Sequence, residues 1–209
     1  MVATHSRKRI ALTTAAVAAA AVSLSACTAV VDGAAVAGDR GPCTHVAAPM
    51  LDIPAGSSSE PMMRIPELPG WERDAEAEDA DSNVRLALSD HDENVIAVMV
   101  QEAPDEDAQT IFDNFEVGVI EGLEQQGLPT EVTRTSHTLC GLPSETVTFG
   151  VSDASSDSAD TLAVVAESGG DTYLIAVVQA VDPHNLARLT EAEKILSGFE
   201  VLPVDAAEA

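Results

Sequence analysis

Basic and aromatic residues are both scarce in this chain of 209 residues, and each shortage excludes a class of function. Lys and Arg total 10 against 35 Asp and Glu, which gives a formal net charge of −25. Because affinity for phosphate depends on Lys and Arg contacts, the composition excludes a nucleic-acid partner. It also excludes a basic patch attracted to anionic lipid. Aromatic residues make up 3% of the chain, too few for a stacking platform or a carbohydrate-binding strip.

The chain also lacks an apolar run of the roughly 20 residues that a membrane-spanning helix needs. Its clearest apolar run, residues 10–22, follows the basic cluster Arg7-Lys8-Arg9 and precedes Leu24-Ser25-Ala26-Cys27. This order is typical of a lipoprotein signal peptide that ends in a lipobox. Small residues before Cys27 let an extended backbone enter a signal peptidase, and the Cys27 thiol accepts the diacylglyceryl group. An ordinary secretory signal followed by a chance cysteine is the alternative.

We therefore predict that residues 1–26 are removed and that acylated Cys27 anchors the mature chain to the membrane. Two or three acyl chains bind a bilayer far more firmly than one. The protein is then expected on the extracytoplasmic face of the cell membrane. Loss of the basic cluster leaves 7 basic against 35 acidic residues, a net charge of −28.

Cysteine is rare as well, and its count is informative. Acylation of Cys27 leaves Cys43 and Cys140 as a single pair in an oxidising compartment, which predicts a disulfide. The bond would close a loop of about 98 residues and contribute up to about 4–5 kcal/mol in the chain-entropy model. Two separate free thiols are the alternative. The chain has no Cys-x-x-Cys motif and no histidine at ligand spacing from either cysteine, so neither a redox motif nor a metal site is expected.

Composition divides the mature chain into three parts. Residues 27–61 are rich in Ala, Gly, Ser and Pro without a sustained period, which predicts a lipidated Cys, a flexible tether and an irregular lead-in. Residues 62–203 are predicted to form a single domain, and residues 204–209 a disordered tail. Within the domain, the acid-rich residues 72–81 are interpreted as a solvated loop.

Apolar and alternating segments predict strands at residues 84–88, 95–100, 132–139, 147–151, 162–165 and 173–178. Residues 95–100 are apolar without alternation, which indicates a strand covered on both faces. Residues 152–160 form a Ser/Asp loop, and Ser168-Gly169-Gly170-Asp171 predicts a tight hairpin turn.

Two main helices are predicted. The first starts at the acidic residues 105–107, carries apolar residues at helical spacing from Ile111 to Leu123, and ends at Gly127 and Pro129. The second starts at residues 182–183 and ends at Gly198. Hairpin connections favour an α+β fold with an antiparallel sheet. Periodicity does not decide whether the helices share one face of that sheet, with the lead-in covering the other.

Motifs that carry catalysis are missing. The chain has no Gly-x-Ser-x-Gly elbow, His-Glu-x-x-His, P-loop or dinucleotide glycine fingerprint. Ser144 has no obvious base. The histidines of the mature chain lie in polar or terminal contexts and are interpreted as surface residues: His45, His91, His137 and His184.

Two acidic segments are candidate cation sites. Asp90-His91-Asp92-Glu93 is interpreted as a charged turn, because Gln101 stands where an EF-hand has its twelfth-position Glu. The segment with Asp153, Asp157 and Asp160 is interpreted as a solvated hairpin. No catalytic residue, metal site or cofactor is therefore predicted.

Five features in order carry a family resemblance: Cys27 in its lipobox, Pro69-Gly70-Trp71, the acidic helix start with Phe112 and Asn114, Cys140-Gly141-Leu142-Pro143-Ser144, and residues 195–201. With them, residues 62–203 resemble the LpqN/LpqT-type lipoproteins of mycobacteria and related actinobacteria. The resemblance implies a PsbP-like α+β sandwich and an envelope lipoprotein without an established catalytic site. A mature chain whose only lysine is Lys194 departs from a typical member.

We therefore expect a non-enzymatic, lipid-anchored envelope protein that presents a small domain to a protein partner in the envelope or outside the cell. The alternative is a carrier of an apolar small molecule or lipid in a cleft between sheet and helix, lined by Phe112, Val119 or Leu189. A hydrolase, the third class, would require a buried Ser–His contact.

Overall fold

The computed structural model describes residues 43, 46–80, 83–92, 94–125, 130–151, 158–182 and 184–204. The predicted signal peptide, Cys27, the tether and residues 205–209 of the tail lie outside the described residues.

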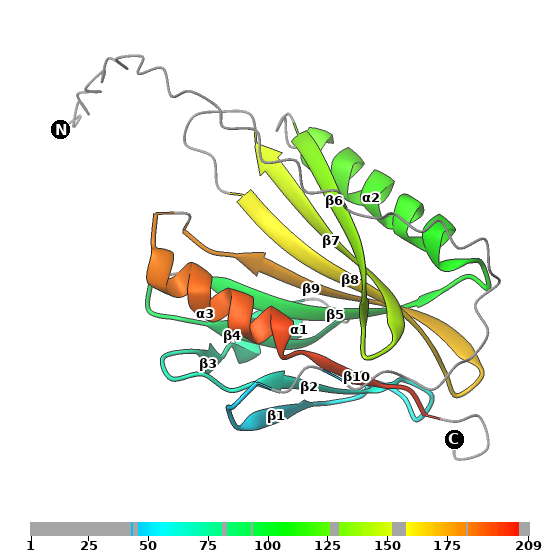
Figure 1. Ribbon diagram of the computed structural model, residues 1–209, viewed down its shortest axis with the longest axis horizontal. Helices are drawn as coiled ribbons and strands as arrows, with labels where there is room; N and C mark the ends of the chain where they lie inside the picture. Colours follow the sequence, from blue (N-terminus) through cyan, green and yellow to red (C-terminus); the bar gives the residue numbers. More distant parts are fainter. Residues whose placement is uncertain are drawn as a thin grey trace, which may run out of the picture. The chain divides into compact units, whose positions relative to one another are not determined.

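The larger of two antiparallel sheets has seven strands in the order β3-β4-β5-β9-β8-β7-β6 (Figure 1). The strands are β3 (Glu72–Arg73), β4 (Val84–Ser89), β5 (Val95–Ala103), β6 (Thr130–Leu139), β7 (Leu142–Val151), β8 (Ser158–Ser168) and β9 (Asp171–Ala180). Strands β8 and β9 are joined by the predicted tight turn, with Gly169 at φ 60° and Gly170 at φ 96°. All six predicted strands are present, and β8 begins earlier than expected, at Ser158.

A second sheet of three strands runs in the order β1-β2-β10, with β1 (Met50–Ile53), β2 (Met62–Pro66) and β10 (Glu200–Leu202). The prediction that the lead-in is irregular up to residue 61 is wrong for β1. Its pairing with β2 satisfies the backbone groups of β1, and the side chain of Ile53 is buried. The strand was missed because it has only four residues and stands between Pro49 and Pro54.

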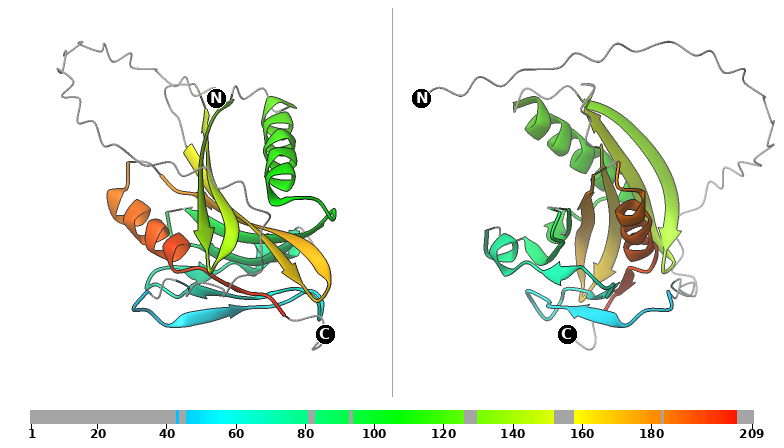
Figure 2. Two further views of the ribbon diagram at one scale, coloured as in Figure 1. Left: turned by 45° about the vertical axis from the view of Figure 1, so that its right-hand side comes forward. Right: turned by 90° about the vertical axis from the view of Figure 1, so that its left-hand side faces the viewer.

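The described residues contain three helices: α1 (Ala75–Ala80), α2 (Ala108–Gln125) and α3 (Leu186–Ser197). Helix α3 and the small sheet cover one face of the large sheet, where Val164 of β8 belongs to the same core as Ala192 and Ile195. Helix α2 covers the opposite face, where Ala163 packs with Phe112. Figure 2 shows the two long helices on either side of the sheet. The two long helices therefore do not share one face of the sheet, a point that periodicity did not decide.

The longest runs of consecutive buried residues, which indicate cover on both faces, lie in the central strands β8 and β9. Residues 162–166 of β8 and 173–177 of β9 are buried at consecutive positions. In β5, by contrast, Ile96, Val98 and Val100 are buried and the residues between them are half-buried. The prediction that residues 95–100 are covered on both faces is therefore wrong, because α2 packs over β8 and β9 and leaves that face of β5 partly open.

The acid-rich segment after Trp71 is ordered, which corrects the prediction of a solvated loop. Asp74 Oδ1 accepts a hydrogen bond from the Ala77 N–H (3.0 Å) and caps α1. The Glu78 carboxylate accepts hydrogen bonds from the Arg73 guanidinium and from the Ala87 N–H (3.2 Å). The Arg73 bond is the main cause of the lowered pKa of Glu78. These side chains fix α1 against β4, although the segment shows no apolar periodicity.

Helix α3 begins later than predicted. Its N-cap is Asn185, whose side chain accepts a hydrogen bond from the Arg188 N–H (3.3 Å), rather than the expected Asp182. Asp182 instead accepts from the His184 N–H in the turn before the helix (2.8 Å). Pro183 lies outside the described residues.

Candidate binding site

Only the first turns of helix α2 are packed into a core. Ile111 and Phe112 are buried against Ala163, Val165 and Leu174 of β8 and β9. The start of the helix is fixed by a local cap, because the Asp107 carboxylate accepts hydrogen bonds from the Thr110 N–H (3.1 Å) and hydroxyl (2.7 Å). The hydroxyl bond is the main cause of the lowered pKa of Asp107.

The rest of α2 is covered incompletely. Of its 18 residues only Ile111 and Phe112 are buried, and Val117 is 53% exposed. Phe115, Val119 and Leu123 continue the apolar stripe but are only half-buried. The apolar stripe that the sequence predicts is present, but only its first turns enter the core.

A hollow of about 360 Å³ lies between α2 and the sheet. Its apolar lining includes Ala103, Ile111, Phe115, Val119 and Leu174, and its polar lining is Gln101 and Asn114. Gly118 also lines it, and a Cβ placed on Gly118 would meet no atom within 4 Å. The volume is at the lower end of the range for small-molecule pockets. Chemically, the hollow can take an apolar group and offer it two amide side chains.

Ion pairs hold the other side of α2 to the edge of the sheet. Arg134 of β6 donates to Asp113 (2.6 Å) and to Glu116 of α2, and these bonds raise the pKa of Arg134. The Arg134 bond is also the main cause of the lowered pKa of Asp113. Beneath them, the buried Glu145 of β7 accepts from the Ser136 hydroxyl (3.0 Å). The contact fixes the helix on its β6 side and leaves the hollow on its β5 side.

A second hollow, of about 630 Å³, lies where the β8–β9 turn faces the connection from β5 to α2. Four exposed acids line it: Glu102, Asp105, Glu167 and Asp171. Its one buried hydroxyl, Ser168, already accepts from the Val204 N–H (2.9 Å). The acids are solvated, and we assign them no ligand.

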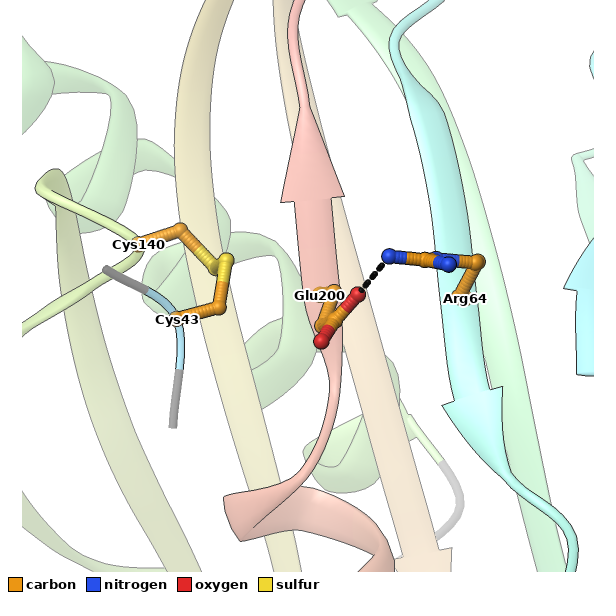
Figure 3. The surroundings of a disulfide bond; sticks show 4 residues. All are labelled: Cys43, Arg64, Cys140 and Glu200. Atoms are coloured by element: carbon orange, nitrogen blue, oxygen red, sulfur yellow. Dashed lines mark hydrogen bonds and ion pairs between the residues drawn. A yellow bond between two sulfur atoms is a disulfide. The ribbon is translucent and has the colours of Figure 1, made fainter. Parts of the chain in front are cut away.

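The structure joins Cys43 to Cys140 by a disulfide, with an S–S distance of 2.01 Å, the pair that the cysteine count singles out. Figure 3 shows the bond beside β10, which the Arg64–Glu200 ion pair (2.5 Å) connects to β2. Cys140 is the first residue of the β6–β7 turn and has a positive φ of 52°. The disulfide thus attaches the start of the described chain to the end of strand β6.

The structure brings Ser144 and His137 opposite each other on β7 and β6, a proximity that the sequence did not suggest. They do not form a nucleophile–base pair. Ser144 is buried, and its Oγ makes no hydrogen bond with any described residue. His137 is exposed, and its Nδ1 lies 3.1 Å from the Thr135 carbonyl oxygen.

In the two acidic segments considered as cation sites, the described residues Asp90 and Asp160 make structural contacts, and Glu93 lies outside the described residues. Asp90 accepts from the side chain and N–H of Asn94 and pairs with Arg188 (2.8 Å). Burial raises the pKa of Asp90, but the Asn94 and Asp92 hydrogen bonds and the Arg188 charge outweigh it, so the pKa is lowered. His91 and His184 are exposed. His45, Asp153 and Asp157 lie outside the described residues.

Asp160 lies on β8 rather than in a loop, and it accepts from Thr148 (2.6 Å) and Gln179 (2.9 Å). Within the described ranges, no three His, Cys, Asp or Glu side chains gather so that they could hold a metal ion. Among the helices of the described part, none combines the length and hydrophobicity needed to cross a membrane.

Of the residues that the sequence suggested as cleft lining, Val119 lines the hollow, whereas Phe112 is buried in the small core. Sequence reasoning missed the glycines of α2. Gly118 and Gly122 both lie inside α2, where glycine is unfavourable relative to alanine by about 1 kcal/mol. Two glycines within an otherwise good helix are a signal for space on the helix surface. Leu189, the third predicted lining residue, packs instead against the core on the α3 side.

The fold is similar to two solved structures. The crystal structure of LpqN, involved in cell envelope biogenesis of Mycobacterium tuberculosis, matches with a TM-score of 0.50 and 15% identity, over 78% of this chain and 100% of that one. The solution structure of cyanobacterial PsbP from Synechocystis matches with a TM-score of 0.51 and 18% identity, over 78% of this chain and 99% of that one. The predicted PsbP-like α+β fold is confirmed. No protein-family model matches the chain, and no curated protein matches its sequence.

Proposed function

We propose that this chain is a non-catalytic envelope lipoprotein of the LpqN/LpqT type, anchored through acylated Cys27 on the extracytoplasmic face of the membrane, that acts by binding a partner protein. The lipobox supports the anchor, and the LpqN-like fold supports a role in the envelope. The observation that carries partner binding is the open surface of α2, an 18-residue helix with two buried residues and a hollow beneath it.

The electrostatics favour binding over acid–base catalysis. A carboxyl that acts as a general acid near neutral pH needs a raised pKa. Among the described residues, each carboxyl with a shifted pKa has it lowered, by arginine or by hydrogen-bond donors: Glu60, Glu78, Asp90, Asp107 and Asp113. At neutral pH these carboxylates stay ionised and accept hydrogen bonds within the chain.

A second candidate function is the carriage of an apolar small molecule in the same hollow. The lining by Phe115, Val119 and Leu174, together with the open space at Gly118, favours it. In this case the ligand fills the hollow from within, whereas a protein partner covers α2 from outside.

Native mass spectrometry of the protein extracted from its own membrane tests both candidates. Gly118→Leu fills the hollow, and Gly122→Leu is the matched control on the same helix, because a Cβ at Gly122 also meets no atom within 4 Å. A retained small molecule that is lost only in Gly118→Leu supports the carrier. A retained protein that cross-links to α2 supports partner binding. Wild-type protein that carries neither overturns the proposal.

The anchor has its own test. Cys27→Ser protein should leave the membrane fraction and carry no acyl group. Wild-type protein found soluble, with an N-terminal residue other than Cys27, would contradict the lipoprotein assignment.

A further inference from the structure

Strand β6 forms a long open edge of the large sheet. It pairs with β7 over ten consecutive positions without a register shift, and no described residue pairs with its other side. Residues 133–138 are exposed at every position, on both faces of the strand. The opposite edge of the sheet, β3, has only two residues. An exposed edge of the length of β6 is a template for an added strand.

The turn after β6 shows which backbone groups face outward. Cys140 (φ 52°) and Gly141 (φ 79°) form a two-residue turn with positive φ at both positions, as in a type I′ hairpin. The flanking pair Leu139–Leu142 is then hydrogen-bonded, and the pattern alternates along the strand. The residues whose N–H and C=O groups face away from β7 are therefore Val132, Arg134, Ser136 and Thr138. Pro143 lies opposite Thr138, at a position where β7 needs no N–H toward β6.

The usual protections of an edge strand are missing from β6. Natural edges carry proline, lysine or a bulge. Residues 130–139 contain neither proline nor lysine, and the ladder to β7 has no bulge. The one basic side chain that would guard the edge, Arg134, is held by Asp113 and Glu116 of α2.

Charge identifies the kind of strand that fits. Each of the five arginines in the described residues is already in an ion pair with a carboxylate: Arg64, Arg73, Arg85, Arg134 and Arg188. The chain has a net charge of −25, so its surface attracts cationic segments and repels a second copy. On β6 itself Glu131 is the only acid, so an incoming strand does not meet a row of carboxylates that it must desolvate.

We propose that the outer edge of β6 receives an added strand from an extended, cationic segment of another envelope protein. Main-chain hydrogen bonds to the outward groups of residues 132–138 provide the attachment, and the acidic surface provides the orientation and the association rate. The inference rests on the proposed function as a partner-binding protein and adds a docking surface separate from the hollow under α2.

The test uses the mature chain with Cys27→Ser, so that detergent is unnecessary, and a nine-residue peptide of alternating Lys and Val. Amide hydrogen exchange by NMR reports protection of the outward N–H groups, and calorimetry gives the affinity. The same peptide with Glu in place of Lys controls for charge. Ser136→Pro removes an outward N–H without breaking the β7 ladder. Ser136→Ala is the matched control, because both variants lose the hydroxyl bond to Glu145 and only the proline loses the N–H.

We expect the outward amides to exchange rapidly in the free chain and to be protected by the Lys peptide, more weakly as salt rises. The affinity for the Lys peptide should be about tenfold lower in Ser136→Pro than in Ser136→Ala, which is the effect of one lost hydrogen bond. If Ser136→Pro fails to fold, Thr138→Pro with Thr138→Val repeats the comparison.

Several outcomes would overturn the inference. If the Glu peptide binds as tightly as the Lys peptide, or if Ser136→Pro and Ser136→Ala have equal affinities for the Lys peptide, a cationic added strand is excluded. If the outward amides are already protected in the free chain, the edge is covered. Protection that does not depend on protein concentration would mean that the chain's own tether covers it. Protection that rises with protein concentration would mean that a second copy covers it. A protein retained in the native mass spectra alongside these outcomes would leave the proposed function standing and remove only the β6 surface.

Discussion

The two faces of the seven-stranded sheet are covered to different degrees. On the α3 face, one core joins β2, β4, β5, β8, β9, β10 and α3, and Ile65, Ile175 and Phe199 are fully buried in it. On the α2 face, five buried residues form a small core at the start of the helix, and the rest of α2 lies over a hollow. The closely packed α3 face is therefore expected to contribute most of the stability, whereas the α2 face has space for a partner.

The largest expected effect comes from a matched pair of phenylalanines. Phe199→Ala should lower the free energy of unfolding by about 3–5 kcal/mol, because it empties a fully buried site on the α3 face. Phe115→Ala, at the half-buried wall of the hollow, should cost about 1 kcal/mol. Urea denaturation of the unacylated chain measures both. Equal losses would mean that the two faces contribute alike to stability, contrary to the difference in their burial.

The disulfide should have the next largest effect, and it acts on the α3 face, where Cys140 belongs to the core. Replacing both Cys43 and Cys140 by serine should cost about 2–4 kcal/mol and preserve the fold, because the cross-link chiefly restricts the unfolded chain. Circular dichroism and urea denaturation measure the two effects. Peptide mapping without reductant should give one linked pair of peptides, and two alkylatable thiols in the native protein would refute the bond.

Acid should weaken the α3 face through the Glu60–Arg85 pair, whose Nη2–Oε1 distance is 2.8 Å. Burial raises the pKa of Glu60. The Arg85 hydrogen bond, the Gly56 N–H and the Arg85 charge together lower it by more, so the pKa lies below the ordinary value of 4.5. Stability from this pair is therefore complete above the unfolded pKa and lost as pH falls through the folded one. Glu60→Gln should cost about 1–3 kcal/mol at pH 7.

The cost of Glu60→Gln should shrink as pH falls from 6 toward 3, measured by urea denaturation at each pH. The control is Asp113→Asn on the α2 face, where the carboxylate is exposed and paired with Arg134. It should leave stability nearly unchanged, because exposed ion pairs contribute little. A pH-independent cost of Glu60→Gln would show that the lost contact is steric rather than ionic.

The parts of the fold predicted from sequence are those with a strong local pattern. The apolar runs of β8 and β9 and the spacing from Ile111 to Leu123 identify these elements directly. Strand β1 and helix α1 were missed because pairing and side-chain caps form them rather than hydrophobic periodicity. The placement of α2 and α3 on opposite faces was not predictable, because periodicity shows which side of a helix is apolar and not which face of a sheet it covers.

The candidate site was predictable only in part. Val119 was named as a lining residue, because an apolar helix position near a sheet is a reasonable wall. The hollow itself is a gap between α2 and β5, and no single residue type encodes a gap. The open edge of β6 was equally hidden, since a strand's position in a sheet depends on all the others. The Cys43–Cys140 pair was accessible because counting cysteines needs no geometry.

Two glycine substitutions in α2 should change stability only slightly, but they separate stability from function on the α2 face. Gly118→Ala and Gly122→Ala should each raise the free energy of unfolding by up to about 1 kcal/mol, since alanine is the better helix former and both sites have room for a methyl group. Only Gly118 lines the hollow. If the hollow is a binding site, Gly118→Ala should lower the amount of retained ligand or partner in native mass spectra, and Gly122→Ala should not. A gain in stability at both sites with retention unchanged at both would mean that the glycines mark a loosely packed helix and that binding occurs elsewhere.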